Sequence, residues 1–223
     1  MRRIETGGAG AEETLVRNRL LALLSPDERA ALRPDLALFQ AERGTPLLTQ
    51  GEPVDSVILS CGALISMVVA MPDGRTAEAG LIGPEGLIGG LSTTAPHPAF
   101  AGAVVLIEGP VAAIKLGAIE ERKARSPALS DGMARYADCF IAQLLQTIAC
   151  NALHPLEKRL ARWLLTVRDL QGADELALTQ GDVSDMLGVQ RTSVTAAAAS
   201  LQEKGFIAYQ RGRIRLTDAD GLQ

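Results

Sequence analysis

The four polar residues from Gln190 to Ser193 have side chains that suit hydrogen bonding to a partner molecule. Arg191 carries a planar guanidinium with several N–H donors, and amide and hydroxyl groups flank it. Thr195 follows about one helical turn later. A guanidinium can donate two parallel hydrogen bonds to the O6 and N7 acceptors of guanine. These residue types therefore indicate contacts with base edges.

A second group of basic side chains follows at Arg211, Arg213 and Arg215, at every second position. Successive side chains of a β-strand point to opposite faces, so this spacing puts the three guanidiniums on one face. Ile214 and Leu216 then point to the other face, toward a core. Phosphate contacts are the simplest use for such a row of arginines.

The segment before Gln190 has the pattern of a short helix and a tight turn. Thr179 and Asp182 have the spacing of a capping box, which satisfies free backbone amides at a helix start. We therefore expect a first helix over about 180–187, and Gly188 suits the left-handed backbone of the turn after it. A second helix starts near Arg191. Its predicted buried side chains are Val194, Ala197 or Ala198, and Leu201.

Gly205 ends this second helix, and the alternation over 206–209 and 214–216 around Arg211-Gly212 predicts a β-hairpin. Two such helices and a hairpin outline a winged helix-turn-helix, whose second helix enters the major groove of DNA. Two alternatives stay open: a small bundle with a solvated arginine face, and a winged helix that contacts protein. The predicted DNA-contacting residues are Gln190, Arg191, Thr192, Ser193, Thr195, Thr179, Arg211 and Arg213.

The remaining residues that could carry other chemistry are dispersed. Cys61, Cys139 and Cys150 lack metal-ligand spacing, and we interpret them as buried apolar thiols rather than redox centres. His97 and His154 belong to no carboxylate or cysteine cluster, and His154 precedes a predicted helix start. No nucleophile, base or metal set is recognisable, so we expect neither an enzyme nor a bound metal or cofactor.

The composition describes a chain with real cores and an uneven charge. The 223 residues are 47% hydrophobic and carry a net charge of −4. Residues 1–150 hold 13 Lys and Arg against 17 Asp and Glu, whereas residues 151–223 hold 9 against 9. The weak overall field predicts modest non-specific affinity for DNA, so specific binding should depend on dimerisation. No segment looks like a membrane span or signal peptide, and we expect a cytoplasmic protein.

Residues from about 41 to 115 form short apolar runs separated by turns, which predicts an antiparallel β-roll. Pro72-Asp73-Gly74 is the strongest hairpin signal among these turns. Helical turns over 15–24 and 26–32 precede the roll. The predicted strands lie in the runs 46–48, 56–59, 63–69, 103–107 and 111–114.

A long helical stretch follows, with apolar residues at steps of three and four on one face. This stripe either packs on its own roll or forms a dimer seam, and the seam is the favoured interpretation. A further helix runs from Leu156 to Gln171 and turns Leu160, Trp163 and Val167 inward. The predicted dimer-interface residues are Leu129, Met133, Tyr136, Phe140, Leu144 and Ile148.

Over almost its full length the chain resembles the Crp/Fnr family of bacterial transcription regulators. The resemblance implies an α+β fold: a cyclic-nucleotide-binding-like β-roll over 1–125, a long dimerisation helix over 126–152, and a winged helix-turn-helix over 153–223. It implies a homodimer on double-stranded DNA, with RNA polymerase as a candidate further partner. It depends on the segments Gln50-Gly51-Glu52, Ser60-Cys61-Gly62, Asp73-Gly74-Arg75, Ile82 to Gly89, Arg159 to Leu165, and Thr179 through Gly188 to Val194.

The chain departs from the family's pattern where cyclic nucleotides bind. Members that bind them carry a Gly-Glu pair for the ribose hydroxyl and a following arginine for the cyclic phosphate. Here Gly89-Gly90 stands in place of that pair, and from Thr76 to Glu121 the only Lys or Arg is Lys115. A buried phosphate needs a cation or converging amides. We therefore expect no control by cyclic AMP through this cassette, although a rebuilt pocket remains an alternative. Candidate effector-pocket residues are Glu85, Gly89 and Gly90.

The recognition helix also differs from the best-known family pattern, an Arg-Glu pair followed by a second outward arginine. Arg191 matches the first arginine, but Thr192 replaces the glutamate and Ala196 the second arginine. A glutamate would accept a hydrogen bond from cytosine N4. Its replacement predicts a different or looser half-site, still read at guanine by Arg191.

Overall fold

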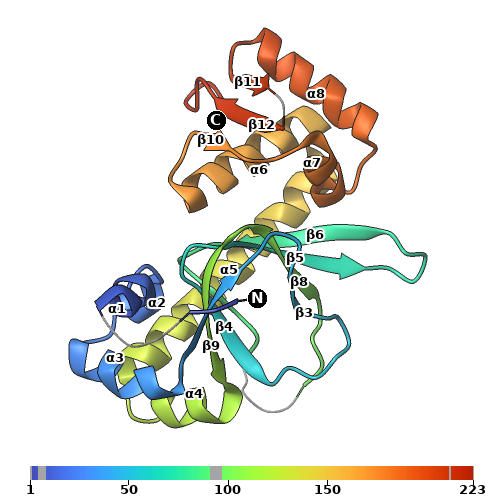
Figure 1. Cartoon of the computed structure of the whole chain (residues 1–223). Helices are drawn as coiled ribbons and strands as arrows, with labels where there is room; N and C mark the ends of the chain where they lie inside the picture. Colours follow the sequence, from blue (N-terminus) through green and yellow to red (C-terminus); the bar gives the residue numbers. More distant parts are fainter. Residues whose placement is uncertain (1, 5–8, 91–96, 211, 223) are drawn as a thin grey trace. The chain divides into compact units, whose positions relative to one another are not determined.

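The computed structural model describes residues 2–4, 9–90, 97–210 and 212–222 (Figure 1). Its internal contacts divide the chain into two compact units. Unit 1 comprises Met1–Met67 and Ile82–Gln143, and unit 2 comprises Val68–Leu81 and Leu144–Gln223. Among the described residues, no helix has both the length and the apolar character needed to cross a membrane.

Two antiparallel sheets form the predicted β-roll. The first has the strand order β1-β2-β9-β4-β7, and the second has the order β3-β8-β5-β6. The strands of the first are β1 (Arg2–Arg3), β2 (Ala37–Ala41), β9 (Gly109–Lys115), β4 (Ser56–Ser60) and β7 (Leu87–Ile88). Those of the second are β3 (Pro46–Leu48), β8 (Gly102–Ile107), β5 (Leu64–Ala70) and β6 (Thr76–Ile82).

The apolar runs of the sequence form the core of the roll. In the central pair, β4 and β9 are antiparallel with Val57 opposite Ile114 and Leu59 opposite Ala112, and all four residues are buried. The predicted fold class is confirmed. The expected strands omit β1, β2, β6 and β7. Of these, β6 is rich in alanine and glycine, which have low strand propensity, and the turn at Gly74 pairs it with β5.

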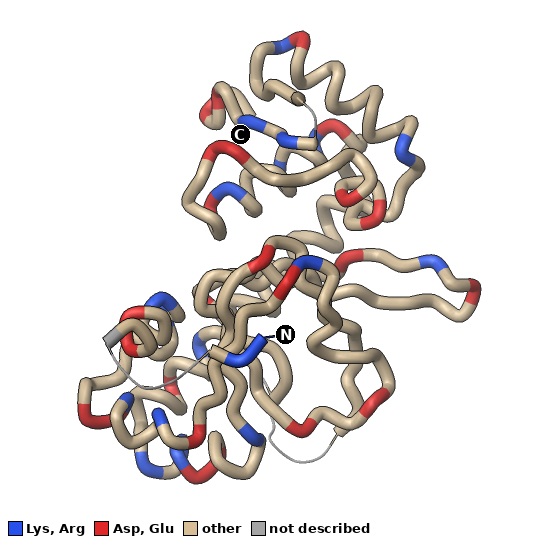
Figure 2. The backbone as a smooth tube through the Cα atoms, in the orientation of Figure 1, with Lys and Arg blue, Asp and Glu red and all other residues tan. Residues whose placement is uncertain are grey.

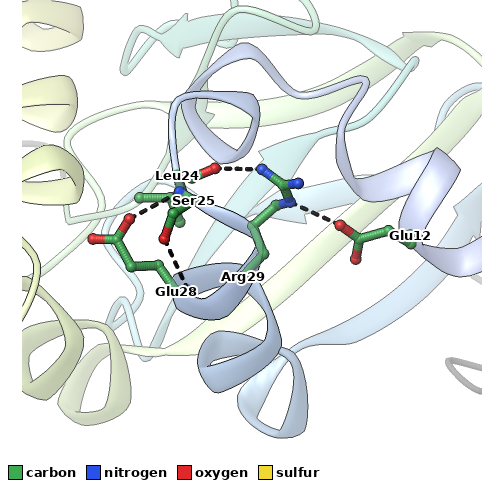
Figure 3. Close-up of polar contacts among 5 residues, drawn as sticks. All are labelled: Glu12, Leu24, Ser25, Glu28 and Arg29. Carbon is green, nitrogen blue, oxygen red and sulfur yellow. Dashed lines mark hydrogen bonds and ion pairs between the residues drawn. The ribbon is translucent and has the colours of Figure 1, made fainter.

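Short helices flank the roll: α1 (Ala9–Leu15), α2 (Arg19–Ala22), α3 (Pro26–Leu32) and α4 (Leu116–Lys123), with a 3-10 turn at Arg33–Asp35. Figure 3 shows how α3 begins: Glu28 N donates to Ser25 Oγ at 3.3 Å, and Ser25 N donates to Glu28 Oε2 at 2.8 Å. In the same view Arg29 Nε donates to Glu12 Oε1 at 2.7 Å, and the guanidinium also bonds the carbonyl of Leu24. The predicted helix over 26–32 is confirmed.

The long helix α5 (Pro127–Leu153) contains all six residues of the predicted dimer seam. Four of the six are buried within the single chain. The hydroxyl of Tyr136 lies where a Cβ on Gly86 would come within 2.3 Å. Leu144 is half-buried, and only Ile148 of the predicted set is well exposed. The four buried residues are Leu129, Met133, Tyr136 and Phe140.

The C-terminal part of unit 2 contains α6 (Leu156–Gln171), α7 (Gln180–Leu187), α8 (Arg191–Glu203) and a three-stranded sheet (Figure 1). The sheet has the order β10-β12-β11, from β10 (Glu175–Leu176), β12 (Arg213–Leu216) and β11 (Ile207–Gln210). The predicted helix over 156–171 is confirmed, and it ends at Gly172 with φ +67°. The outer part of the β5–β6 hairpin also belongs to this unit, and Trp163 Nε1 donates to Glu78 Oε1 at 2.8 Å.

Candidate nucleic-acid interface

The first helix of the pair, α7, begins at the predicted capping box. Thr179 N donates to Asp182 Oδ2 at 2.6 Å, and Asp182 N donates to Thr179 Oγ1 at 3.2 Å. The helix ends at Gly188, whose φ of +63° is the left-handed conformation expected there. Val189 N then donates to the carbonyl of Ser184 at 3.1 Å. These local contacts fix the turn that leads into α8.

The second helix, α8, starts at Arg191 and packs through a buried stripe. The predicted inward residues are buried, and both alanines of the predicted pair belong to the stripe. Arg191 is exposed, and the described part of the chain gives its side chain no ion pair or hydrogen bond. Its guanidinium is therefore available to an external acceptor. The other exposed residues around this first turn are Gln190, Thr192, Ser193 and Thr195.

Gln180, the first residue of α7, is a member of this surface that the sequence analysis did not include. Thr195 Oγ1 lies 2.8 Å from Gln180 Oε1 and 3.0 Å from the carbonyl oxygen of Arg191, so its hydroxyl lies between the two helices. Because the amide oxygen of Gln180 faces Thr195, its amide nitrogen is left to point elsewhere. The position of Gln180 directly after the capping residue Thr179 was the signal available in the sequence.

Thr179 itself is exposed, but its hydroxyl already serves the cap. Besides accepting from Asp182 N, Thr179 Oγ1 donates to Asp182 Oδ2 at 2.8 Å. The structure therefore gives Thr179 a positioning role at the start of α7. Its DNA contact stays a prediction.

The hairpin β11–β12 forms as predicted, with Tyr209 opposite Ile214. Ile214 and Leu216 are buried, whereas Arg213 and Arg215 are exposed on the opposite face. The guanidinium of Arg213 is paired with the carboxylate of Glu175 on the neighbouring strand β10. Since both side chains are more than half exposed, this pair is worth little and a phosphate could compete with it. Arg211 lies outside the described residues.

Helix α6 supports both helices of the pair. Arg159 Nη2 donates to the carbonyl oxygen of Leu187 at 2.8 Å, at the end of α7. Ser200 Oγ donates to Glu157 Oε2 at 2.6 Å, and Lys204 bonds the other carboxylate oxygen. The hydrogen bonds from Lys204 and Ser200 lower the pKa of Glu157. The contacts of the ionised Glu157 with Ser200 and Lys204 thus hold the C-terminal end of α8 on α6.

Charge is mixed rather than concentrated around this surface. Figure 2 shows acidic and basic residues interspersed along the C-terminal helices and strands. The 9 basic and 9 acidic residues over 151–223 leave this region neutral overall. Base discrimination by this region would therefore depend on individual side chains rather than on its net charge.

Of the candidate effector residues, Glu85 lies in the turn between β6 and β7, and Gly89 and Gly90 directly follow β7. Glu85 turns back on this segment, since its Oε1 accepts from Gly83 N at 2.9 Å, and burial raises the pKa of its carboxyl. Gly89 has φ +74°, and a Cβ there would lie 2.5 Å from the carbonyl oxygen of Ser56. Gly90 also has a left-handed backbone, with φ +59°. The rest of the expected cassette, 91–96, lies outside the described residues.

Lys115, the one Lys or Arg in the sequence from Thr76 to Glu121, pairs with Asp55 rather than with Glu85. Lys115 Nζ lies 2.6 Å from Asp55 Oδ2, and both side chains are more than 70% exposed. The ion pair lowers the pKa of Asp55. Lys115 therefore does not supply a buried countercharge beside Glu85 or Gly89.

The thiols agree with the sequence interpretation only in part. Cys61 and Cys150 are buried, but Cys139 is exposed on α5, where apolar burial was expected. Burial raises the pKa of the Cys61 thiol to about 12. Within the described ranges, no group of three or more His, Cys, Asp or Glu side chains could hold a metal ion.

Comparisons with known proteins agree with this geometry. Residues 158–223 match the family model of the Crp-like helix-turn-helix domain. A CRP-like cAMP-activated global transcriptional regulator of Mycobacterium tuberculosis is 23% identical over 218 residues, which covers 95% of this chain and 97% of that protein.

Solved structures share the fold. FixK2 from Bradyrhizobium japonicum aligns with a TM-score of 0.72 at 18% identity, covering 84% of this chain and 95% of FixK2. The c-di-GMP-responsive global regulator CLP of Xanthomonas campestris aligns with a TM-score of 0.72 at 13% identity, covering 86% of this chain and 99% of CLP. With its β-roll, its long helix and a Crp-like helix-turn-helix domain over residues 158–223, this chain is similar to transcription regulators of the Crp/Fnr family.

Proposed function

We propose that this chain is a dimeric regulator that binds a two-fold symmetric operator and reads a guanine in each half-site through Arg191. The observation that carries the proposal is the exposed first turn of α8, where the Arg191 guanidinium has no partner among the described residues. The start of a recognition helix is the part that reaches base edges in the major groove. The fork of N–H donors matches guanine O6 and N7.

The neighbours of Arg191 support an operator unlike the best-known one. Thr192 is exposed and cannot replace a glutamate as an acceptor for cytosine N4 in the same geometry, and Ala196 offers no polar group. Gln190 and Ser193 are exposed candidates for further base or phosphate contacts, and Arg213 for a phosphate contact. The half-site should therefore be specified at fewer positions.

The surface of α5 supports a homodimer through a seam that differs from the predicted one. Ile141, Leu145 and Ile148 are exposed at steps of four and three, the spacing of a coiled-coil seam. We assign the dimer contact to these three residues. A two-fold dimer places its two recognition helices on half-sites about one helical turn of DNA apart. RNA polymerase is a further partner that this role would require for activation, and the cytoplasm is the compartment we propose.

We further propose that cyclic AMP does not control the protein through the usual cassette. Gly90 supplies no carboxylate, and the stretch from Thr76 to Glu121 contains no arginine. The M. tuberculosis relative is cAMP-activated and CLP responds to c-di-GMP, so similar proteins differ in their effectors. Calorimetric titration with cyclic AMP and cyclic GMP should give no saturable heat, and a saturable signal would favour a rebuilt pocket.

The DNA proposal is tested by selecting bound sequences from random duplex DNA and then measuring the affinity for the selected operator. Arg191→Ala should cost about 1–3 kcal/mol of discrimination at one guanine per half-site and leave other positions unchanged. Arg17→Ala, which removes an exposed arginine of unit 1 two residues after the end of α1, is the control and should change nothing. Unaltered discrimination in Arg191→Ala would refute the assignment, and absence of DNA binding by the intact protein would favour a winged helix that contacts protein.

A further inference from the structure

Unit 2 contains a cavity that neither the DNA surface nor the roll accounts for. It lies between the end of α5, the first half of α6 and the C-terminal segment after β12, and its volume is about 540 Å³. This is within the range of roughly 300–1,000 Å³ typical of small-molecule sites. None of its lining residues belongs to the exposed first turn of α8. The side chains used below are those of Cys150, His154, Lys158, Arg162, Phe206 and Leu222.

One wall of the cavity is cationic. His154, Lys158 and Arg162 line it at steps of four residues, the first just before α6 and the other two within it. In the described part of the chain, neither His154 nor Lys158 has an ion pair or a side-chain hydrogen bond. Glu157, the acid among the lining residues, is already bonded to Ser200 and Lys204. The wall therefore carries positive charge without a nearby free carboxylate.

Arg162 gives the strongest indication of a ligand. Its Nε is completely buried and has no hydrogen-bond partner among the described residues. Buried polar groups of proteins are nearly always paired, because an unpaired N–H loses its hydration without compensation. Because Arg162 also lines the cavity, a turn of its side chain toward an anionic oxygen there would give the guanidinium the missing acceptor and a charge-assisted hydrogen bond.

Most of the other lining residues are apolar. Among them, Leu222 and Leu201 are buried, and Phe206 and Leu165 are half-buried. Cys150 lies buried at one side, where Gln146 Nε2 is 3.2 Å from its sulfur. A small inorganic anion would leave this apolar surface uncovered. The lining instead suits a molecule with one charged end and an apolar body.

We propose that this cavity binds an amphipathic organic anion, with its acidic group against Lys158 and Arg162 and its apolar body against Phe206 and Leu222. The site is independent of the roll and of the proposed base contacts. Helix α6 contacts α7 through Arg159 and α8 through Glu157. A molecule bound in the cavity would therefore stabilise the helix that supports the proposed DNA-binding surface.

The test is calorimetric titration of the intact protein with octanoate, an amphipathic anion, and with octanol, its uncharged counterpart. Octanoate should bind at one site per subunit, and octanol at least about tenfold more weakly, which corresponds to about 1.4 kcal/mol. Lys158→Gln and Arg162→Gln should each raise the octanoate Kd about tenfold. Arg17→Gln, a charge removal in unit 1, should leave it unchanged.

Three results would overturn the proposal: no saturable octanoate binding up to about 10 mM, equal affinity for octanol, or octanoate binding that neither substitution weakens. Lys158 is exposed, so Lys158→Gln should fold normally even if Arg162→Gln does not. These readouts use no DNA. The site can therefore fail while the operator assignment stands, and the reverse also holds.

Discussion

Truncation of Leu145 should dissociate the proposed dimer. Leu145 is the central residue of the exposed α5 seam, between Ile141 and Ile148, and the three side chains are 54–64% exposed in the single chain. Apolar side chains left uncovered at coiled-coil spacing are stabilised by a second helix with the same seam. The expected effect of Leu145→Ala follows from the area that the partner would cover.

The magnitude can be worked out for this one residue. Leu→Ala removes roughly three methylene equivalents, each worth about 0.8 kcal/mol when fully buried. Because 62% of Leu145 is available for burial, the loss is about 1.5 kcal/mol per subunit. A two-fold seam contains the residue twice, so the total is about 3 kcal/mol, or roughly two orders of magnitude in the dimer Kd.

Sedimentation equilibrium over a range of protein concentrations measures this constant directly. Leu23→Ala is a matched control, because Leu23 is also 62% exposed but lies directly after α2, away from the α5 seam. Leu23→Ala should leave the dimer Kd unchanged. The reasoning would be refuted by a Leu145→Ala dimer within about threefold of the wild type, or by an equal effect of Leu23→Ala.

Three further predictions concern single side chains. Burial raises the pKa of Glu85 above its ordinary value of 4.5. The folded state is therefore stabilised by the protonated carboxyl below pH 4.5, and this stabilisation is lost as the pH rises through the pKa of the folded state. Glu85→Gln keeps an acceptor oxygen for Gly83, and its stability gain over wild type in urea unfolding should be larger near pH 7 than near pH 4; an equal gain would contradict this. Thr179→Ala should lower the free energy of unfolding by about 1 kcal/mol by removing the α7 cap, whereas Thr192→Ala should have little effect. A thiol reagent should label Cys139 quickly and the buried Cys61 slowly, and a fast phase that survives Cys139→Ser would show this to be wrong.

The C-terminal helices and hairpin were predictable because their signals are local. Thr179 and Asp182 are three residues apart, Gly188 needs a left-handed backbone at the turn, and Ile214 and Leu216 alternate with arginines. Each signal acts within one turn of helix or one pair of strand positions. The contacts of Gln180 with Thr195 and of Arg213 with Glu175 join residues far apart in the sequence, and no local pattern indicates them.

The proposed dimer seam does not follow from periodicity alone. Helix α5 has two apolar faces, and the more regular one, through Met133 and Phe140, packs within the chain. Periodicity identifies a face that must be buried but not what covers it. The shorter row through Ile141 and Leu145 can be recognised only once the structure shows that the first face is buried within the chain.

The left-handed backbone at Gly90 bears on how this regulator could change its effector during evolution. In the sequence, a glutamate at position 90 would supply the carboxylate that the family resemblance assigns to ribose binding. At φ +59°, however, a residue with a Cβ is strained by about 1–3 kcal/mol. The neighbouring Gly89 admits no side chain at all beside Ser56. A glutamate at position 90 would thus require the turn to be reshaped before its carboxylate became useful, so a single substitution is a poor route to such a site.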